Sequence, residues 1–193
     1  MSFINNITEI RQNARKKIED GAITPDYEIN PKDAVGILNA ALATEIICVL
    51  RYRYHYFMAS GINSAAVAEE FLQHANEEQQ HADRIAERIK QLGGKPEMNP
   101  AVITKNSHSE YVEGSTLTEM IKEDLIAERI AIESYREMIN YFGDKDPTSR
   151  RMLEEILAVE EEHADELADL LFATNPESDR KVAAVAGHKK SGN

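Results

Sequence analysis

Cysteine, tryptophan, glycine and proline are all scarce in this chain of 193 residues. The single cysteine, Cys48, forms no intramolecular disulfide and excludes Cys-x-x-Cys redox or zinc motifs. No stretch approaches the roughly 18 uninterrupted apolar residues of a membrane-spanning helix, so we expect no membrane insertion. The first residues also lack the charged start and apolar run of a secretory signal, which predicts a cytoplasmic protein.

Acidic residues are in excess. The 34 Asp and Glu residues against 22 Lys and Arg residues give a formal net charge of −12. This balance disfavours binding to nucleic acid, so a DNA partner is not expected. The hydrophobic fraction of 42% nevertheless suffices for a sizeable core in one domain. The surplus carboxylates therefore either cover a solvated surface or hold cations.

Long helical segments separated by Gly and Pro account for most of the chain. Apolar spacing predicts a helix over residues 3–20 and four longer helices over 31–60, 64–93, 116–143 and 147–173, whereas residues 95–114 show no period. No segment alternates like a half-buried strand. We therefore predict an all-α protein with an N-terminal helical extension (1–30), a four-helix bundle (31–173) and a flexible polar tail (174–193).

The lengths of the connections indicate how the four long helices are arranged. The first and second helices, and likewise the third and fourth, are joined by only a few residues, which makes each pair antiparallel neighbours. The link between the second and third helices, residues 95–114, is long enough to run the length of a helix and leave these two parallel. The sequence thus predicts two helical hairpins joined by one long crossover.

The two predicted hairpins share a pattern of chemically active residues. Each has a glutamate on its first helix and a Glu-x-x-His-Ala-Asp motif on its second, 33 residues later in one hairpin and 32 in the other. One Glu-x-x-His is expected by chance in such a glutamate-rich chain, but a repeat of this length indicates internal duplication of a hairpin. The repeated residues are Glu45, Glu78, His81, Glu128, Glu160 and His163.

These six residues fall in line with the apolar stripes of their helices, on faces that a bundle buries. A buried carboxylate without a partner costs on the order of several kcal/mol, so four of them need neutralising charge. Two divalent cations would supply it. Oxygen and imidazole ligands suit iron or manganese, whereas the lack of thiolates disfavours structural zinc. Four Glu and two His, with Glu-x-x-His on two helices, match the ligand set of di-iron and di-manganese carboxylate bundles.

With these motifs the chain resembles bacterioferritin-type members of the ferritin-like superfamily over about residues 34–172. The resemblance implies a ferritin-like four-helix bundle with two iron ions per chain, or manganese as the alternative. It further implies that Glu78 and Glu160 bridge the two ions. The ends of the pair would be bound by Glu45 with His81 and by Glu128 with His163.

Differences between this sequence and related families limit which members of the superfamily it resembles. Animal-type ferritins have one Glu-x-x-His rather than two, and rubrerythrins have a further glutamate where this chain has Ala131. The N-terminal segment and the lack of a fifth helix are similar to Dps-like relatives that keep a bacterioferritin-type centre. Bacterioferritins bind haem through a methionine directly after the second-helix glutamate. Gln79 stands at that position, so we expect no haem.

Three further residues have predicted roles around the six ligands. Asp124, one turn before Glu128, is expected to accept the free ring N–H of a ligand histidine; an acid favoured near a helix N-terminus is the alternative. Tyr52 is expected to point toward the metals, either as a hydrogen-bonded core tyrosine or as an electron donor. His74 is either a simple polar histidine or a ligand on an iron-transit path.

The predicted function is ferroxidase activity with iron storage or detoxification. Fe(II) would be oxidised by O2 or H2O2 at a di-iron centre within each subunit of a hollow homo-oligomer of 12 or 24 subunits, as the resemblance implies. One alternative is a di-iron peroxidase or di-manganese catalase without a mineral. Another is a Dps-like shell that protects DNA, for which the basic residues of the tail are weak support.

Overall fold

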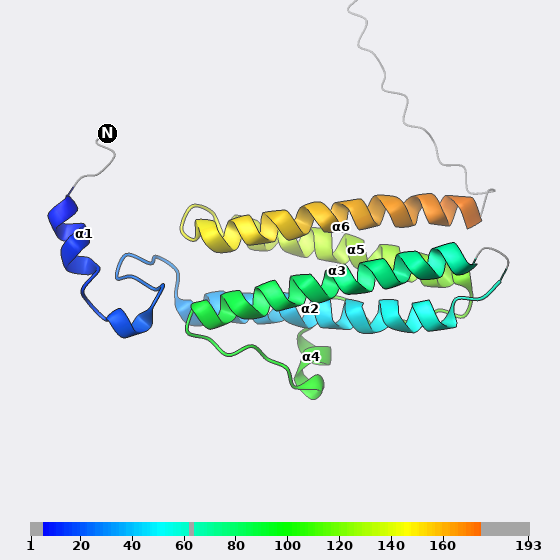
Figure 1. Ribbon diagram of the computed structural model, residues 1–193, viewed down its shortest axis with the longest axis horizontal. Coiled ribbons are helices and arrows are strands. Elements are labelled where there is room, and N and C mark those ends of the chain that lie inside the picture. The colour runs from blue at the N-terminus through cyan, green and yellow to red at the C-terminus, as the bar shows by residue number, and fades with distance from the viewer. Residues whose placement is uncertain (1–5, 62–63, 175–193) are drawn as a thin grey trace, which may run out of the picture.

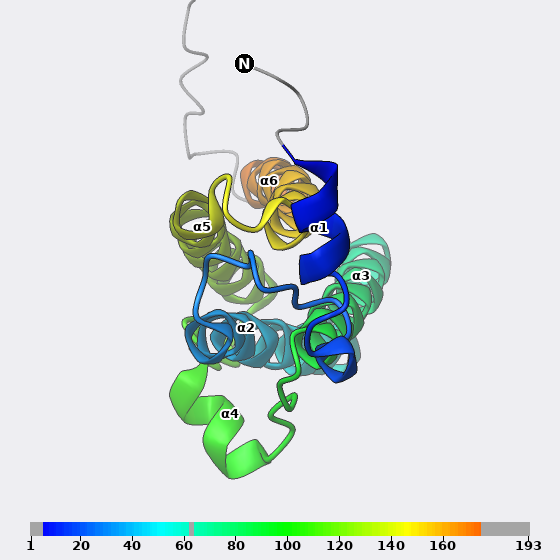
Figure 2. The same cartoon turned by 90° about the vertical axis from the view of Figure 1, so that its left-hand side faces the viewer.

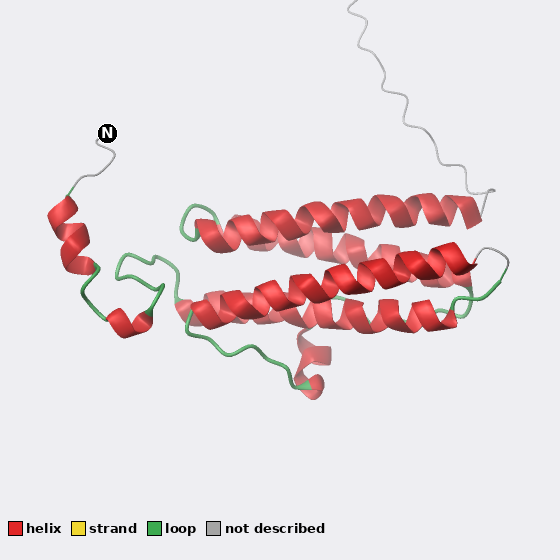
Figure 3. Cartoon of the chain, in the orientation of Figure 1, coloured by secondary structure: helices red, strands yellow, loops and turns green. Residues whose placement is uncertain are grey.

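The computed structural model describes residues 6–61 and 64–174, so the predicted tail lies outside the described residues. Within these ranges there are helices and no strands (Figure 3). The helices are α1 (Ile7–Asn13), the short 3-10 helix η1 (Ile18–Asp20), α2 (Pro31–Met58), α3 (Ser64–Gln91), α4 (Pro100–Asn106), α5 (Leu117–Phe142) and α6 (Pro147–Thr174). The predicted all-α class is confirmed.

Local signals fix the ends of the bundle helices. The Asn30 side chain caps α2 by accepting a hydrogen bond from the Lys32 N–H at 3.0 Å, and a proline takes the first helical position, where no N–H is required. Thr116 caps α5 by accepting from the Glu119 N–H at 3.2 Å. Helix α5 ends before Gly143, whose φ of 46° is a left-handed value that glycine adopts without strain.

The four long helices form two antiparallel hairpins (Figure 1). Helix α2 packs chiefly against α3, and α5 packs chiefly against α6. Seen end-on, these helices occupy the corners of a bundle, and α4 lies outside it beyond α2 (Figure 2). The segment between α3 and α5 returns along the bundle, so α3 and α5 run in the same direction (Figure 1). This is the predicted layout with one long crossover.

The N-terminal segment is not the continuous helix that its apolar spacing predicts. Helix α1 ends at Asn13, and Lys17 adopts a left-handed φ of 48° before η1. The apolar side chains of this segment find no core to pack against, since Ile10 is 49% and Ile18 is 76% exposed. A short helix without a buried face has little to stabilise it, which explains the break.

The crossover contains a helix that the sequence pattern does not indicate. Helix α4 starts after Asn99, whose side chain accepts a hydrogen bond from the Ala101 N–H at 3.1 Å. Its one buried side chain, Ile103, packs against α2 beside Ile47. A helix of two turns with a single buried side chain is too short to produce a detectable apolar period.

The buried carboxylate of Asp146 joins three parts of the chain at the end of the bundle where α6 begins. Asp146 accepts the Ser149 N–H at 2.9 Å and pairs with the guanidinium of Arg88 on α3 at 2.9 Å. It also accepts the hydroxyl of Tyr27 at 2.8 Å, which attaches the segment before α2 to the bundle. The N-terminus of α6, α3 and the N-terminal segment therefore share one anchor.

The interior of the bundle consists of two apolar clusters with a polar layer between them. On α2, Leu42 belongs to one cluster, Cys48 belongs to the other, and the buried Glu45 lies between them. The other three bundle helices show the same succession of apolar, polar and apolar positions. All four helices thus bring their buried polar residues to one level.

Helix α2 is long and apolar enough, by length and composition alone, to cross a membrane. In the fold, however, 56% of its most apolar stretch is buried inside the bundle. The buried part includes Leu38, Leu42 and the polar residue Glu45, which is how a bundle-core helix is built.

Candidate metal centre

The six residues that the motif repeat predicts meet in the polar layer. Helix α2 supplies one glutamate, α5 supplies another, and α3 and α6 each supply a Glu-x-x-His pair. Glu128 and Glu160 are fully buried, and the most exposed of the six, His81, is only 4% exposed. The full set is Glu45, Glu78, His81, Glu128, Glu160 and His163.

Their ligand atoms form two overlapping groups, each compact enough to hold one metal ion. In the first group, Nδ1 of His81 lies 3.4 Å from Glu45 Oε2 and 3.0 Å from Glu160 Oε1. In the second, Nδ1 of His163 lies 3.3 Å from Glu78 Oε1 and 3.7 Å from Glu160 Oε2. Glu78 and Glu160 belong to both groups, which is the geometry required of two bridging carboxylates.

Many polar atoms of this layer have no hydrogen-bond partner that would explain their burial. Seven buried side-chain atoms of the six residues lack a partner, among them both oxygens of Glu160 and the Nδ1 atoms of both histidines. Buried polar atoms are almost always satisfied, and leaving one unsatisfied costs about 1–3 kcal/mol. Divalent cations among these atoms would satisfy them together, so the residues present fit a di-metal centre.

Without a metal, the four carboxyl groups divide into two pairs whose pKa values shift in opposite directions. Burial, followed by repulsion from Glu78, raises the pKa of Glu45 to about 8, and burial raises the pKa of Glu128 well above its usual value. Burial also opposes ionisation of Glu78 and Glu160, but close contacts with His81 and His163 outweigh it and hold the pKa of both groups below the usual value. The bridging carboxylates are therefore ionised while the outer two are protonated.

The two histidines respond to these carboxylates. Burial disfavours the imidazolium form of His163, yet the close approach of Glu160 and Glu78 to Nδ1, at 3.7 and 3.3 Å, outweighs it and raises the pKa of His163 to about 12. The pKa of His81 is raised in the same way by Glu160, Glu45 and Glu78. Two imidazolium ions thus neutralise the two ionised carboxylates of the metal-free centre, and a metal must displace these protons to bind.

Tyrosines hold the two outer carboxylates in a crossed arrangement. The Tyr52 hydroxyl on α2 donates to Glu128 on α5, while the Tyr135 hydroxyl on α5 donates to Glu45 on α2. Both tyrosines are buried, and both lie seven residues after the glutamate of their own helix. The predicted inward orientation of Tyr52 is confirmed, whereas its role as an electron donor stays a prediction.

Asp124 does not accept a hydrogen bond from a ligand histidine, contrary to our expectation. Its two carboxylate oxygens bind Arg51 Nε at 2.8 Å and His55 Nδ1 at 2.7 Å instead. The partner of His163 is Glu77, whose Oε2 lies 2.7 Å from the Nε2 atom of the ring. Because His163 directs Nδ1 into the centre, the hydrogen bond to Glu77 fixes the tautomer and orientation that a metal ligand needs.

Sequence reasoning missed what Arg51 and His55 do. Arg51 donates to the backbone oxygen of Glu110 at 2.8 Å, and His55 Nε2 lies 2.8 Å from the backbone oxygen of Glu113. These contacts and Asp124 attach the end of the crossover to α2 and α5. The arginine-rich run at residues 51–56 is a signal for such a network, but it does not reveal which loop atoms the side chains reach.

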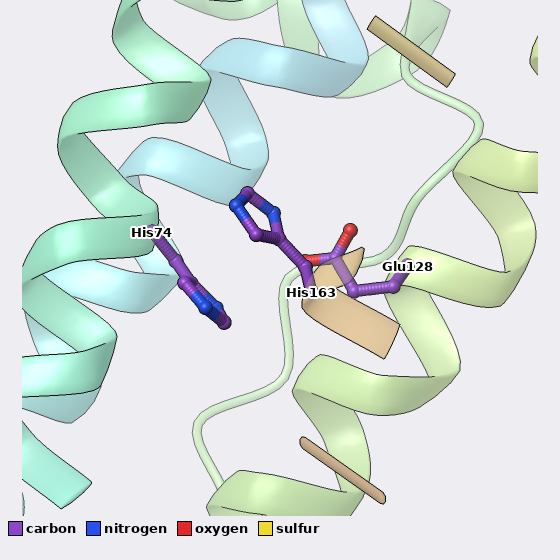
Figure 4. A group of neighbouring side chains, drawn as sticks. All are labelled: His74, Glu128 and His163. Carbon is purple, nitrogen blue, oxygen red and sulfur yellow. The ribbon is translucent and has the colours of Figure 1, made fainter. Parts of the chain in front are cut away.

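His74 is buried beside the centre rather than exposed on the helix surface. Its ring stacks on that of His163 with centroids 3.9 Å apart. Figure 4 shows the side chains of His74, Glu128 and His163 converging from different helices. The Nδ1 atom of His74 lies 3.2 Å from the Tyr52 hydroxyl, so the ring also touches the group that holds Glu128.

A cavity between α3 and α6 leads from the surface to the centre. Its volume is about 310 Å³, and both ligand histidines line it. The other lining residues are mostly polar or acidic, including Gln73, Glu77 and Glu166. Three glutamates against one arginine, Arg84, give this cavity a net acidic lining, which favours cations over anions.

Comparisons with known proteins agree with this architecture. A family model described as a ferritin-like domain matches residues 35–175. A bacterioferritin of Rhodobacter capsulatus is 31% identical over 68% of this chain and 78% of its own length. A nutrient stress-induced DNA-binding protein of a Nostoc species is 30% identical over 80% of this chain and 85% of its own length.

A solved structure is also similar. The bacterioferritin-related protein of Bacteroides fragilis, described as a dodecameric thioferritin, superposes with a TM-score of 0.74. Its sequence is 33% identical, and the match covers 80% of this chain and 94% of that one.

Fold and site together define a four-helix-bundle protein with a candidate di-metal carboxylate centre in its interior. The family match spans most of the chain and includes every residue of that centre. The protein belongs to the ferritin-like domain family, with bacterioferritins among its relatives.

Proposed function

We propose that the protein is a ferroxidase, which oxidises Fe(II) to Fe(III) at the buried centre and stores or detoxifies the product. The observation that carries this proposal is the set of seven unsatisfied atoms on six buried ligands, with two glutamates shared between two compact groups. Its bacterioferritin relatives support iron oxidation and storage at the level of the family.

The ligands would hold two Fe(II) ions side by side as substrates. Four ionised carboxylates and two neutral imidazoles carry four negative charges, which balance two divalent cations. Each Fe(II) gives up one electron, and the two electrons with two protons reduce one H2O2 to two water molecules or one O2 to H2O2. The oxygen-rich ligand set stabilises the more highly charged ferric product, and the acidic cavity between α3 and α6 is the route for entry and exit.

We further propose that the subunits assemble into a hollow shell that receives the ferric product. The dodecameric relative from Bacteroides fragilis supports an assembly of this type, and it favours twelve subunits over twenty-four. A shell gives the oxidised iron a compartment in which to form a mineral, which a single bundle does not provide.

The double variant Glu78→Gln with Glu160→Gln tests the centre. It keeps the shape of both bridging side chains but removes the negative charges that two Fe(II) ions share. Oxidation of Fe(II), followed by the absorbance of the ferric product after anaerobic loading, should fall at least about 100-fold. The matched control is Glu69→Gln with Glu161→Gln, two exposed glutamates on the same two helices. Wild-type rates in the Glu78–Glu160 variant would refute the site.

Anaerobic loading with excess Fe(II) followed by oxidant distinguishes storage from peroxidase or catalase activity. A storage protein should accumulate iron far beyond two ions per chain as a mineral that co-elutes with the protein. Continued peroxide turnover with only two metal ions per chain would instead favour the di-iron peroxidase or di-manganese catalase.

We also propose that the protein binds no haem at Gln79. This side chain is exposed on α3, and its amide nitrogen donates to Asp83 at 2.9 Å. An amide is a poor replacement for the thioether that binds haem iron. The protein reconstituted with haem and then desalted should show no Soret band of stoichiometric intensity. An intensity that corresponds to one haem per pair of subunits would contradict the proposal.

A further inference from the structure

A third group of metal-binding residues lies beside the centre, between α3 and α6. Glu70, His74 and Glu166 place one ligand atom each within 4.8 Å of one another. The Nε2 atom of His74 lies 3.0 Å from Glu166 Oε2 and 3.6 Å from Glu70 Oε1. The histidine is fully buried, whereas the side chains of Glu70 and Glu166 are 31% and 39% exposed, so the group connects the interior to the surface.

Hydrogen bonding determines which nitrogen of His74 faces the two carboxylates as an acceptor. A carboxylate that binds a metal carries no proton, so the Tyr52 hydroxyl donates to Glu128. The Tyr52 oxygen must then accept from Nδ1–H of His74, 3.2 Å away. In the neutral ring this leaves the Nε2 lone pair facing two acidic side chains, which gives three ligand atoms that one divalent cation can bind together.

We propose that Glu70, His74 and Glu166 form a third divalent-cation site, separate from the two positions of the di-metal centre. Metal bonds to imidazole nitrogen and carboxylate oxygen of about 2.0–2.2 Å place two such ligand atoms roughly 3 Å apart, which agrees with the separations between His74 and the two glutamates. The hydrogen bond from His74 Nδ1 to Tyr52 gives the ring the outer support that metal-binding histidines have.

From its position, we assign this site the role of supplying cations to the di-metal centre. Glu166 also lines the cavity between α3 and α6, and the His74 ring stacks on the ligand His163. His74 further groups with Glu128 and His163 within the same 4.8 Å limit. A cation held at the third site therefore lies next to the metal position that Glu128 and His163 would form. That the cation is Fe(II) rests on the proposed function, whereas the existence of the site does not.

Anaerobic titration with Co(II), followed by visible absorption and by metal analysis after gel filtration, counts the sites. The full-length wild type should bind three Co(II) ions per chain. Glu70→Gln with Glu166→Gln should bind two and keep the spectrum of the centre. Glu78→Gln with Glu160→Gln should retain one. The exposed pair Glu69→Gln with Glu161→Gln, which removes the same charge from the same helices, should still bind three.

The three counts separate failure of this site from failure of the centre. Two ions in the wild type, or three in the Glu70–Glu166 variant, would overturn the third site and leave the centre intact. If the Glu78–Glu160 variant still bound as many ions as the wild type, the di-metal centre would be refuted instead. If the site supplies Fe(II), the Glu70–Glu166 variant should also need several-fold more Fe(II) for half-maximal oxidation, with an unchanged maximal rate.

Discussion

At the scale of single residues, the centre joins charged groups that a bundle interior would otherwise exclude. Three of the six ligands have a partner that sets their orientation: tyrosines hold the outer carboxylates, and Glu77 holds the ring of His163. These supporting contacts come from side chains that lie outside the repeated motif or at its edge. Changes in the support should therefore alter metal affinity without removing a ligand.

Replacement of Glu77 tests this support. Glu77→Gln keeps the size of the side chain but weakens the charge-assisted hydrogen bond to His163 Nε2, so metal affinity should fall about 10–100-fold. Competition with a chelator of known affinity, monitored with Co(II), measures the change. Exposed Glu69→Gln on the same helix is the control. Equal affinities for the Glu77 variant and the wild type would show that the hydrogen bond does not support the ligand.

The stability of the metal-free protein should fall as pH rises from about 6.5 to about 8. Glu45 has a pKa of about 8 in the fold against 4.5 ordinarily, and His163 has a pKa of about 12 against 6.5. In this range the folded state therefore holds protons that the unfolded chain has released. Glu78 and Glu160 have lowered pKa values and are ionised in both states, so they add no slope.

Metal ions should oppose this loss of stability with rising pH. They bind only deprotonated ligands, so their binding strengthens as pH rises. Thermal unfolding over the same pH range, with chelator and with saturating Co(II), measures both effects. The melting temperature with chelator should decrease with pH, and the difference between the two samples should widen. A difference that stays constant across the range would mean that the ligands are already deprotonated in the metal-free fold.

The repeat explains which residues were predictable from the sequence. Three ligand positions appear twice at nearly the same spacing and interrupt apolar stripes, so the burial and convergence of the six residues follow from helical geometry. The partner of Asp124 does not follow, because Arg51 and His55 reach it across the bundle from α2. The role of Glu77 could not be predicted either. The sequence shows only an acidic residue next to Glu78, and its contact with His163 on another helix appears only in the fold.

At the scale of helices, predictability depends on whether a segment has a buried face. The four bundle helices have long apolar stripes and strong caps, and their ends agree with the sequence prediction within a few residues. Helix α1 and the segment to Ile18 have no buried residue, so periodic apolar positions alone overestimate the helix. Helix α4 shows the opposite case, in which a cap and one buried Ile103 suffice.

The anchor at Asp146 should matter for stability more than any exposed ion pair. Asp146→Ala removes the cap of α6 and the buried partner of Arg88, which is 8% exposed, so the free energy of unfolding should fall by about 3–5 kcal/mol. Asp144→Ala is the control: its side chain is 99% exposed and pairs with Arg150 at the surface, for an effect of about 0–1 kcal/mol. Chemical denaturation measures both, and similar losses would contradict a buried anchor.

At the scale of the whole molecule, the duplicated hairpin gives the bundle an internal two-fold relation. The centre lies where the two hairpins meet, and each hairpin supplies three of its six ligands. Neither hairpin holds a complete pair of metal positions alone, because each compact group takes residues from both. Each candidate metal position therefore needs residues from both hairpins.

Light scattering coupled to size-exclusion chromatography tests the proposed assembly. Twelve chains of 21.7 kDa give a particle of about 260 kDa, and twenty-four give about 520 kDa. We expect the smaller particle, in the metal-free and the iron-loaded protein alike. A monomer or dimer at micromolar concentration would contradict the shell and leave the centre without a compartment for mineral.

The polar layer between two apolar clusters has a consequence for the lifetime of the protein. All four bundle helices meet at this level, and metal ions there would brace them against separation. A chain without metal keeps a belt of poorly satisfied groups across its middle. Transient opening, which exposes a chain to proteases, should therefore be more frequent in the metal-free form. The amount of protein in a cell would then follow the supply of metal through degradation alone, before any control of synthesis.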